Sequence, residues 1–233
     1  MRFSDVTLEQ VDTETERVLT TAATLRDEAL AAPSLCRGWS RGHVLAHLAR
    51  NADALARVYA VGSTGVPDTM YDSDEARDAD IDAGASSSCA AQVADLRESA
   101  ARFAAQARRF DAAQGGLRVE RTPGGRRIPL EKVLFMRLRE LVYHHVDLDA
   151  GFTFGQASPE VLGMFLADAV KRLRSTPEPP GLTIVTFEGD EHTVGTGETG
   201  VEGSRAGVLL WLGREDSSDV RFDGPVPTLP FGG

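Results

Sequence analysis

The sequence predicts an α+β protein in which a four-helix bundle is followed by a small α/β domain. Three observations carry this prediction. The first 150 residues hold four segments with the three-four apolar spacing of amphipathic helices. A linker-like run, STPEPPG at 175–181, then interrupts the helical pattern. Beyond it lies the pattern of a β-hairpin, in which LTIVTFE and GDEHTVG meet at a Gly-Asp turn.

The first two helices are predicted from apolar spacing and from a capping residue. Apolar residues three and four apart define a helix over 8–25, and an Ala-Ala-Pro sequence ends the segment. Ser40 is a typical N-cap for the next helix, and Trp39 before it is placed to pack on Val44 as a hydrophobic staple. This second helix should run to about Ala60.

Residues 62–88 lack apolar periodicity. They begin with GSTGVPD, end with GASSS, and contain seven acidic residues against one basic residue, Arg77. We expect a structureless, solvated connector here, with a lid over a ligand as the alternative, because long loops in compact domains are usually mobile or functional.

Two further helices complete the predicted bundle. The spacing indicates a helix over 93–110, and another from about Pro129 to Gly151 that is apolar nearly all round and should be the most buried. Glycine-rich loops are expected at 115–116 and 123–125. The four helices should pack as an antiparallel bundle.

The remainder of the chain predicts a mixture of helices and strands. A helix is expected over 158–174, before the hairpin. Ser204 is placed to cap a short helix that ends in VLLWLGR, and the segment DVRFDG indicates another strand. The segment GTGETG at 195–200 fits Gly-x-Gly-x-x-Gly, but no long helix follows it, so we interpret it as a turn-rich hairpin loop.

Composition and charge exclude several classes of partner. Of 233 residues, 25 are Lys or Arg and 35 are Asp or Glu, which gives a net charge of −10. Nucleic acid and anionic membrane surfaces are therefore not expected partners. The two cysteines, Cys36 and Cys89, are too far apart for a zinc knuckle or a disulfide framework. With no signal peptide or 18-residue apolar stretch, we expect a cytoplasmic protein.

The strongest chemical pattern is Glu140 with His144, four residues apart on one face of the predicted fourth helix. A carboxylate and an imidazole on a core-facing stripe need partners, because burying either group alone is costly. One interpretation is a structural network in which Arg137 pairs with Glu140. His145 lies on another side of the helix and is expected to be structural or exposed.

His47 supplies a third polar side chain from the second helix. It lies on the same helix face as the apolar stripe, whereas His43 lies at the margin of that face. If the two helices are neighbours, His47, Glu140 and His144 converge as two nitrogens and one oxygen. That ligand set with an open position is typical of catalytic zinc, and also of non-haem iron. The sequence therefore predicts a divalent metal site.

The chain resembles the mycothiol-dependent maleylpyruvate isomerases in three segments, which read LCRGWSRGHVLAHLARNADAL, RLRELVYHHVDLDAG and VLLWLGR. The resemblance covers nearly the whole chain in the expected order. It implies a DinB-like, metal-binding four-helix bundle over 1–153 and a small sterol-carrier-like α/β domain over 154–233. It also implies Zn²⁺, or another divalent metal, held by His47, Glu140 and His144.

The resemblance further implies a reaction and a substrate-binding residue. Mycothiol, as a thiol cosubstrate, would add to the cis double bond of maleylpyruvate and be eliminated after rotation, leaving fumarylpyruvate. The arginine that acts in the family falls on Arg214, where its planar fork suits a carboxylate, with Arg137 as a second choice. Asn51 and Asp147 are expected to orient the metal ligands.

Two other functions stay open at this point. The same site suits a mycothiol-dependent S-transferase that acts on another electrophile. A non-catalytic metal-binding or regulatory bundle is the third reading, in which the polar cluster is a structural network. The expected partners are thus mycothiol and an anionic or electrophilic small molecule.

Overall fold

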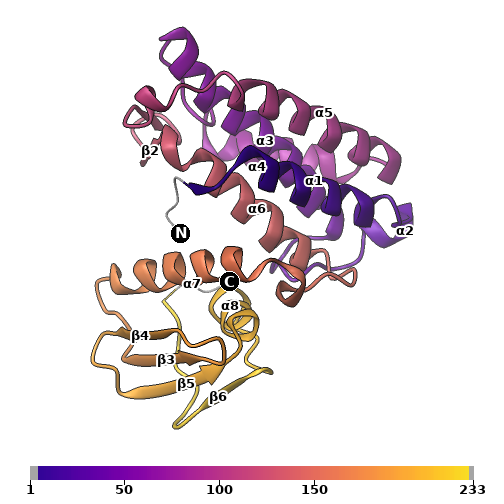
Figure 1. Ribbon diagram of the computed structural model, residues 1–233. Coiled ribbons are helices and arrows are strands. Elements are labelled where there is room, and N and C mark those ends of the chain that lie inside the picture. Colours follow the sequence, from indigo (N-terminus) through magenta and orange to yellow (C-terminus); the bar gives the residue numbers. More distant parts are fainter. Residues whose placement is uncertain (1–4, 231–233) are drawn as a thin grey trace. The chain divides into compact units, whose positions relative to one another are not determined.

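The computed structural model describes residues 5–230, so residues 1–4 and 231–233 of the two predicted domains lie outside it. The chain divides into two compact units, one ending at Ala150 and the other beginning at Gly151. The first unit is mainly helical, and the second combines helices with a four-stranded sheet (Figure 1). The predicted α+β class, with a DinB-like bundle before a small α/β region, is confirmed.

Four long helices enclose the core of the first unit: α1 (Leu8–Ala22), α3 (Arg41–Thr64), α5 (Cys89–Ala107) and α6 (Val133–Asp147). Both α1 and α3 pack against α5 and α6, so the four helices surround one apolar interior (Figure 1). This interior is made of buried aliphatic and aromatic side chains, among them Val11, Val18, Leu48, Leu55, Leu96, Phe103, Leu138 and Leu141.

Some helix ends agree with the prediction and others differ from it by a few residues; α6, for example, runs from Val133 to Asp147 rather than from Pro129 to Gly151. Ser40 caps α3 as predicted. Its hydroxyl oxygen accepts the N–H of His43, and Nδ1 of the His43 ring accepts the N–H of Ser40. The first helix ends at Ala22 rather than Leu25, where turn-type hydrogen bonds replace α-helical ones. A short helix, α2 (Asp27–Leu30), follows it.

The prediction of a structureless connector at 62–88 is wrong. The α3 helix continues to Thr64, and α4 (Asp74–Ala85) follows it and packs on α3. Ser73 caps α4 by accepting the N–H of Ala76, and acidic residues in its first turn suit the positive end of the helix dipole. Within α4 only Ile81 is buried. A single buried apolar residue gives no periodic stripe in the sequence, so apolar spacing did not predict this helix.

A short antiparallel hairpin stands before α6, where the sequence indicated only loops. Its strands are β1 (Arg118–Glu120) and β2 (Arg127–Pro129). Gly124 in the turn has a φ of +72°, which favours glycine. The hairpin buries Val119 and Ile128, which face each other across the strands.

The second unit packs two helices against a sheet. The helices are α7 (Pro159–Arg174) and α8 (Arg205–Arg214), and the strand order is β4 (Glu191–Val194), β3 (Leu182–Thr186), β5 (Thr199–Gly203) and β6 (Val220–Phe222). The predicted helix over 158–174, the hairpin, the Ser204 cap and the last strand are confirmed. The interpretation of 195–200 as a loop holds for residues 195–198. Thr199 and Gly200 instead begin β5, which pairs parallel to β3.

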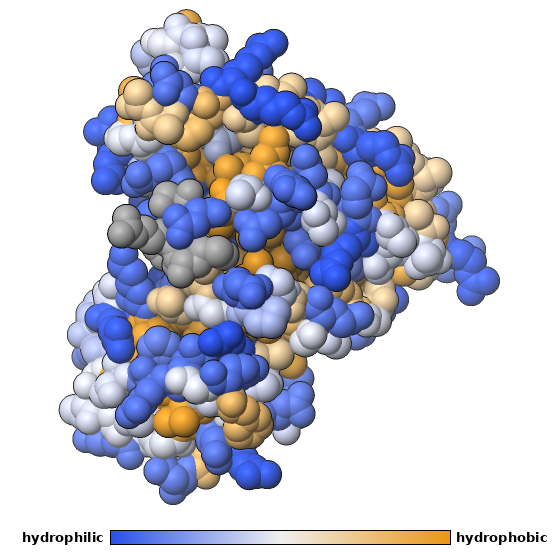
Figure 2. All heavy atoms as spheres, in the orientation of Figure 1, coloured by the Kyte–Doolittle hydropathy of each residue, from blue (hydrophilic) through white to orange (hydrophobic). Residues whose placement is uncertain are grey.

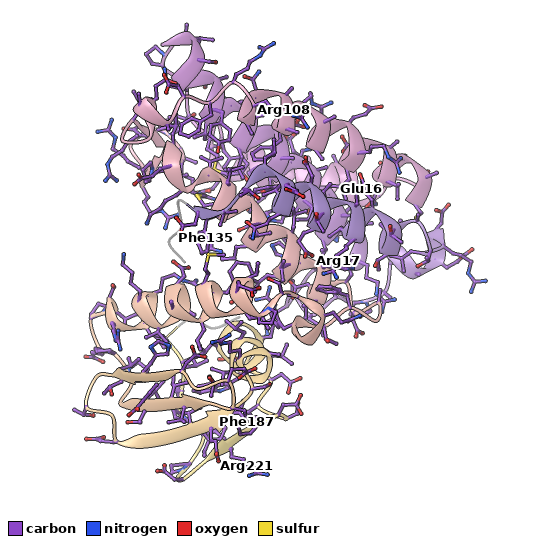
Figure 3. All side chains as sticks on the ribbon, viewed as in Figure 1. Glu16, Arg17, Arg108, Phe135, Phe187 and Arg221 are labelled. Carbon is purple, nitrogen blue, oxygen red and sulfur yellow. The ribbon has the colours of Figure 1, made fainter. Side chains whose placement is uncertain are left out.

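Polar side chains cover most of the surface in view, and apolar residues form small patches between them (Figure 2). Among the cross-helix contacts, Arg108 after α5 lies 3.6 Å from Asp12 of α1. Figure 3 labels Arg108 together with Arg17 of α1, which pairs with Glu14 one turn earlier. No helix in residues 5–230 is both long and apolar enough to cross a bilayer.

Candidate metal centre

Three predicted side chains meet between α3 and α6. Nε2 of His47 lies 2.9 Å from Oε2 of Glu140, and Nε2 of His144 lies 3.3 Å from the same oxygen. One donor atom from each of the three residues lies within 4.8 Å of the others. They come together because α3 and α6 are neighbours and because residues 140 and 144 share a helix face. The convergence expected from helix faces is therefore observed.

Two of the three side chains, His47 and Glu140, are in protonation states that suit a cation. Burial lowers the pKa of His47 to about 4, so this ring is neutral at pH 7. Burial alone would raise the pKa of Glu140, but hydrogen bonds with His144 and His47 hold it well below its usual value. Burial alone would lower the pKa of His144, but its hydrogen bonds, first to Asp147, raise it well above its usual value. A metal ion would thus displace one proton, from His144.

Asp147 orients His144. Its Oδ2 lies 2.7 Å from Nδ1 of His144, which leaves Nε2 of that ring directed at Glu140. The Asp147 side chain is only 1% exposed, so water does not compete for this bond. A carboxylate that accepts the second N–H of a histidine is the usual support of a metal ligand. Asp147 is therefore placed as expected.

Cys36 lies beside this pair and was not predicted. Its Sγ is 3.1 Å from Oδ2 of Asp147 and 3.8 Å from Nδ1 of His144. The three residues form a second group with donor atoms close enough for a metal, but Nδ1 of His144 is already engaged by Asp147. A lone cysteine in a loop has no spacing pattern, so the sequence held no signal for its position.

Trp39 and Arg77 also lie at the site. The centroid of the Trp39 ring is 5.2 Å from that of His47 and 6.2 Å from that of His144. Trp39 thus lies beside the two histidines, and the hypothesis that it packs on Val44 as a staple stays a prediction. Arg77 reaches the site from α4, and its Nη2 lies 3.3 Å from Nδ1 of His47.

Arg137 and Asn51, which were expected to support the site, are hydrogen-bonded to each other. Arg137 is fully buried and donates to the Leu48 carbonyl at 2.8 Å and to Oδ1 of Asn51 at 2.9 Å. Asn51 is thus engaged with Arg137 rather than with a metal ligand. An arginine buried in this way does not reach a substrate, which removes Arg137 as a second choice for that role. Nη2 of Arg139 lies 3.8 Å from Oε1 of Glu140.

The remaining candidates lie outside the group formed by His47, Glu140 and His144, which we call the triad. His145 is buried, with Nε2 2.7 Å from Oγ1 of Thr21, which is the structural position expected for it. His43 supports the Ser40 cap of α3, because its Nδ1 accepts the N–H of Ser40, and its Nε2 faces Asp82 at 3.5 Å. Arg214 is the last residue of α8 in the second unit, where it donates to the Gly213 carbonyl. Its part in substrate binding stays a prediction.

The sequence and the fold match known proteins. Residues 11–149 match the family model described as the mycothiol maleylpyruvate isomerase N-terminal domain. The chain is 29% identical to a mycothiol-dependent maleylpyruvate isomerase of known crystal structure, over 99% of each chain, with a TM-score of 0.89.

A histidine-to-alanine mutant of a mycothiol-dependent maleylpyruvate isomerase is equally similar, with 28% identity, the same coverage and a TM-score of 0.89. No curated protein is similar enough in sequence to count as a match. Because the family model covers more than half of the chain, this protein belongs to the mycothiol maleylpyruvate isomerase family.

Proposed function

We propose that this protein is a divalent-metal- and mycothiol-dependent isomerase that converts maleylpyruvate to fumarylpyruvate. The observation that carries the proposal is the convergence of His47, Glu140 and His144 on one point, with Asp147 behind His144. Family membership and the similarity over the whole chain support the reaction type. At 29% identity the exact substrate is part of the proposal.

The donor set fits a divalent cation such as Zn²⁺. Two imidazole nitrogens and one carboxylate oxygen lie within 4.8 Å, and Glu140 is ionised at neutral pH. His47 is neutral, and its Nε2 presents a lone pair once the single ring proton lies on Nδ1. His144 becomes available once its Nε2 proton leaves, because Asp147 keeps the Nδ1 proton. When bound, such an ion lowers the pKa of a coordinated thiol, so that the thiolate is present at neutral pH.

The reaction is an addition followed by an elimination. The thiolate of mycothiol forms a C–S bond to one carbon of the cis double bond, and the electron pair of that bond moves to the conjugated carbonyl group. Rotation about the new single bond and departure of the thiolate restore the double bond in the trans form. The thiol is thus regenerated, and no oxidant or reductant is consumed.

The chain's own residues hold the reactants. Trp39 lies beside His47 and His144 and gives the site one apolar wall. We propose that Arg214 binds one carboxylate of the substrate, because a guanidinium stays charged and pairs with a carboxylate through two parallel hydrogen bonds.

The direct test is to incubate metal-loaded protein with maleylpyruvate, with and without mycothiol, and to separate the two isomers by chromatography. We expect conversion only when both thiol and metal are present. His47→Ala and Glu140→Ala should lose bound metal and activity together. His43→Ala is the matched control, because it removes a histidine of the same helix that lies outside the triad.

Two outcomes would replace the proposal. Thiol-dependent consumption of a reporter electrophile such as chlorodinitrobenzene, without conversion of maleylpyruvate, would assign the chain to the S-transferase alternative. Purified protein that takes up no stoichiometric metal, or a triad variant that retains full activity, would refute the metal site itself and favour a non-catalytic bundle.

A further inference from the structure

Arg77 is the one basic residue among residues 62–88. Its Nη1 donates to Oδ1 of the exposed Asp78, while its Nη2 faces His47 of the metal site. The Arg77 side chain is 19% exposed, whereas that of Asp78 is 62% exposed. Its guanidinium carbon lies 5.8 Å from the ring of Trp39 and 5.9 Å from the ring of Tyr71. Such cation–ring contacts hold the guanidinium in place beside the triad without neutralising its charge.

The hydrogen bond between Arg77 and His47 depends on which ring nitrogen carries the proton. A neutral imidazole has one N–H, and its other nitrogen accepts. Nε2 of His47 faces Oε2 of Glu140, an acceptor, so the proton is on Nε2, and Nδ1 accepts from Nη2 of Arg77 at 3.3 Å. Both ring nitrogens are therefore satisfied in this arrangement.

A His47 that ligates a metal cannot keep that arrangement. Ligation uses the lone pair of Nε2, so the proton of the neutral ring must be on Nδ1. The Nδ1–H group and the guanidinium of Arg77 would then be two donors facing each other, with no acceptor between them. A guanidinium has no lone pair to offer, so both donors need a third group.

A carboxylate meets this need. Its two oxygens can accept from the guanidinium of Arg77 and from the Nδ1–H of His47 at once. The surrounding charges favour an anion. A divalent ion, Arg77 and Arg139 carry four positive charges, which outweigh the three negative charges of Glu140, Asp147 and Asp78. Tyr71, whose hydroxyl bonds with Arg77 and Asn51, helps to orient the guanidinium.

We propose that Arg77 of α4 binds a carboxylate of the substrate, beside His47 and next to the metal centre. The proposal rests on the proposed function, which makes the substrate a carboxylate-bearing cis-alkene. It assigns to the acidic segment 62–88 a part in substrate binding. Among the two anions of the reaction, the carboxylate of the substrate and the thiolate of mycothiol, Arg77 is assigned to the carboxylate.

The test uses full-length protein loaded with Co²⁺ and two probes, maleate and mycothiol. Binding is measured by calorimetry and by the visible absorption of the cobalt ion, so no turnover is needed. The variants are Arg77→Met and Arg77→Lys. Arg121→Met is the matched control, because Arg121 also lies 5.3 Å from the Tyr71 ring but pairs with Asp74 on the outside of α4.

We expect Arg77→Met to weaken maleate binding about 10- to 100-fold, as for a lost charge-assisted hydrogen bond. Arg77→Lys should recover part of this loss, because it keeps the charge but not the fork. Arg121→Met should bind maleate within about threefold of the wild type, and mycothiol binding and cobalt content should not change in any variant.

Several results would overturn the proposal. They are wild-type protein that does not bind maleate, an Arg77→Met variant that binds maleate normally, an equal loss in Arg121→Met, or loss of cobalt from Arg77→Met and Arg77→Lys. The test is separable from that of the isomerase. Maleate binding that depends on Arg77 without isomerisation refutes only the proposed reaction, whereas isomerisation with an unchanged KM in Arg77→Met refutes only this assignment.

Discussion

The hydrogen bond between Asp147 and His144 offers a quantitative test of the metal centre. Replacing Asp147 with Asn keeps an oxygen that can accept from Nδ1 of His144 but removes the negative charge behind the ring. The native contact is 2.7 Å long and excluded from water, so no solvent molecule compensates for the change. We therefore expect Asp147→Asn to bind Zn²⁺ more weakly than the wild type.

The size of the effect follows from the role of such partners. Loss of a carboxylate behind a ligating histidine costs about 10- to 100-fold in metal affinity. This corresponds to about 1.4–2.8 kcal/mol. Asp147→Asn should lie near the lower value, because the amide oxygen still accepts, and Asp147→Ala near the upper value, because it leaves the buried Nδ1–H without a partner.

The pH dependence separates this effect from a change in proton competition. Because hydrogen bonds with Asp147 and Glu140 raise the pKa of His144, the metal-free ring is protonated at neutral pH, and zinc must displace that proton. Apparent affinity should therefore rise about tenfold per pH unit until the pKa of His144 is passed, and then level off. In Asp147→Asn the apparent affinity should level off at a lower pH than in the wild type, and its plateau value should be lower. The plateau affinities are compared because proton competition no longer contributes there.

The assay is competition with a chromophoric chelator across this pH range. Asp149→Asn is the matched control, because that side chain is 64% exposed and pairs with Arg41 rather than with His144. Equal plateau affinities for the wild type and a correctly folded Asp147→Ala variant would refute the reasoning, since they would show that the carboxylate does not support a metal ligand.

Three further predictions concern stability. Zn²⁺ at 100 times its Kd should raise the free energy of unfolding by about 2.7 kcal/mol; Glu140→Gln should lose most of this gain in thermal melts with and without chelator, and an equal gain would exclude Glu140 as a ligand. Asn51→Ala should cost about 2 kcal/mol in urea unfolding, because it removes an acceptor from the buried charge of Arg137; Asn51→Asp, which keeps the acceptor, should retain most of the stability, and equal losses in both would contradict this. Ser40→Ala should cost about 1 kcal/mol through loss of the α3 cap, whereas Ser63→Ala, at the exposed end of the same helix, should stay within about 0.5 kcal/mol; similar losses would show that the cap does not matter.

The long helices were predictable because each buries a full stripe of side chains. In α5, Val93, Leu96 and Phe103 carry the stripe, and all three are buried. The α4 helix has no such stripe, because only Ile81 is buried and the helix depends on its cap and on close contact with α3. A Cβ on Gly84 would lie 2.9 Å from that of Ala46, so the glycine permits this approach. Close backbone contact of this kind leaves no periodicity in a sequence.

The predictability of the site residues also depends on which element carries them. His47, Glu140, His144 and Asp147 lie on long helices, where residue spacing alone decides which face a side chain occupies. Trp39, Cys36 and Arg77 come from a loop and from α4, so their positions depend on how those segments pack over α3 and α6. That packing depends on tertiary contacts, and no local sequence pattern predicts it.

The acidic charge of the protein is compatible with an anion at the metal centre, because the two are separated by the orientation of α4. Five acidic residues of this helix are exposed: Asp74, Glu75, Asp78, Asp80 and Asp82. Their field is weakened by solvent and salt, which screen exposed charges beyond about 10 Å. Arg77 pairs with Asp78 through Nη1, but its own side chain is mostly shielded from water and its Nη2 lies 3.3 Å from Nδ1 of His47, so its charge acts on the site with little screening. A net charge of −10 therefore argues against acidic surfaces as partners, but it does not describe the field that a carboxylate meets beside His47.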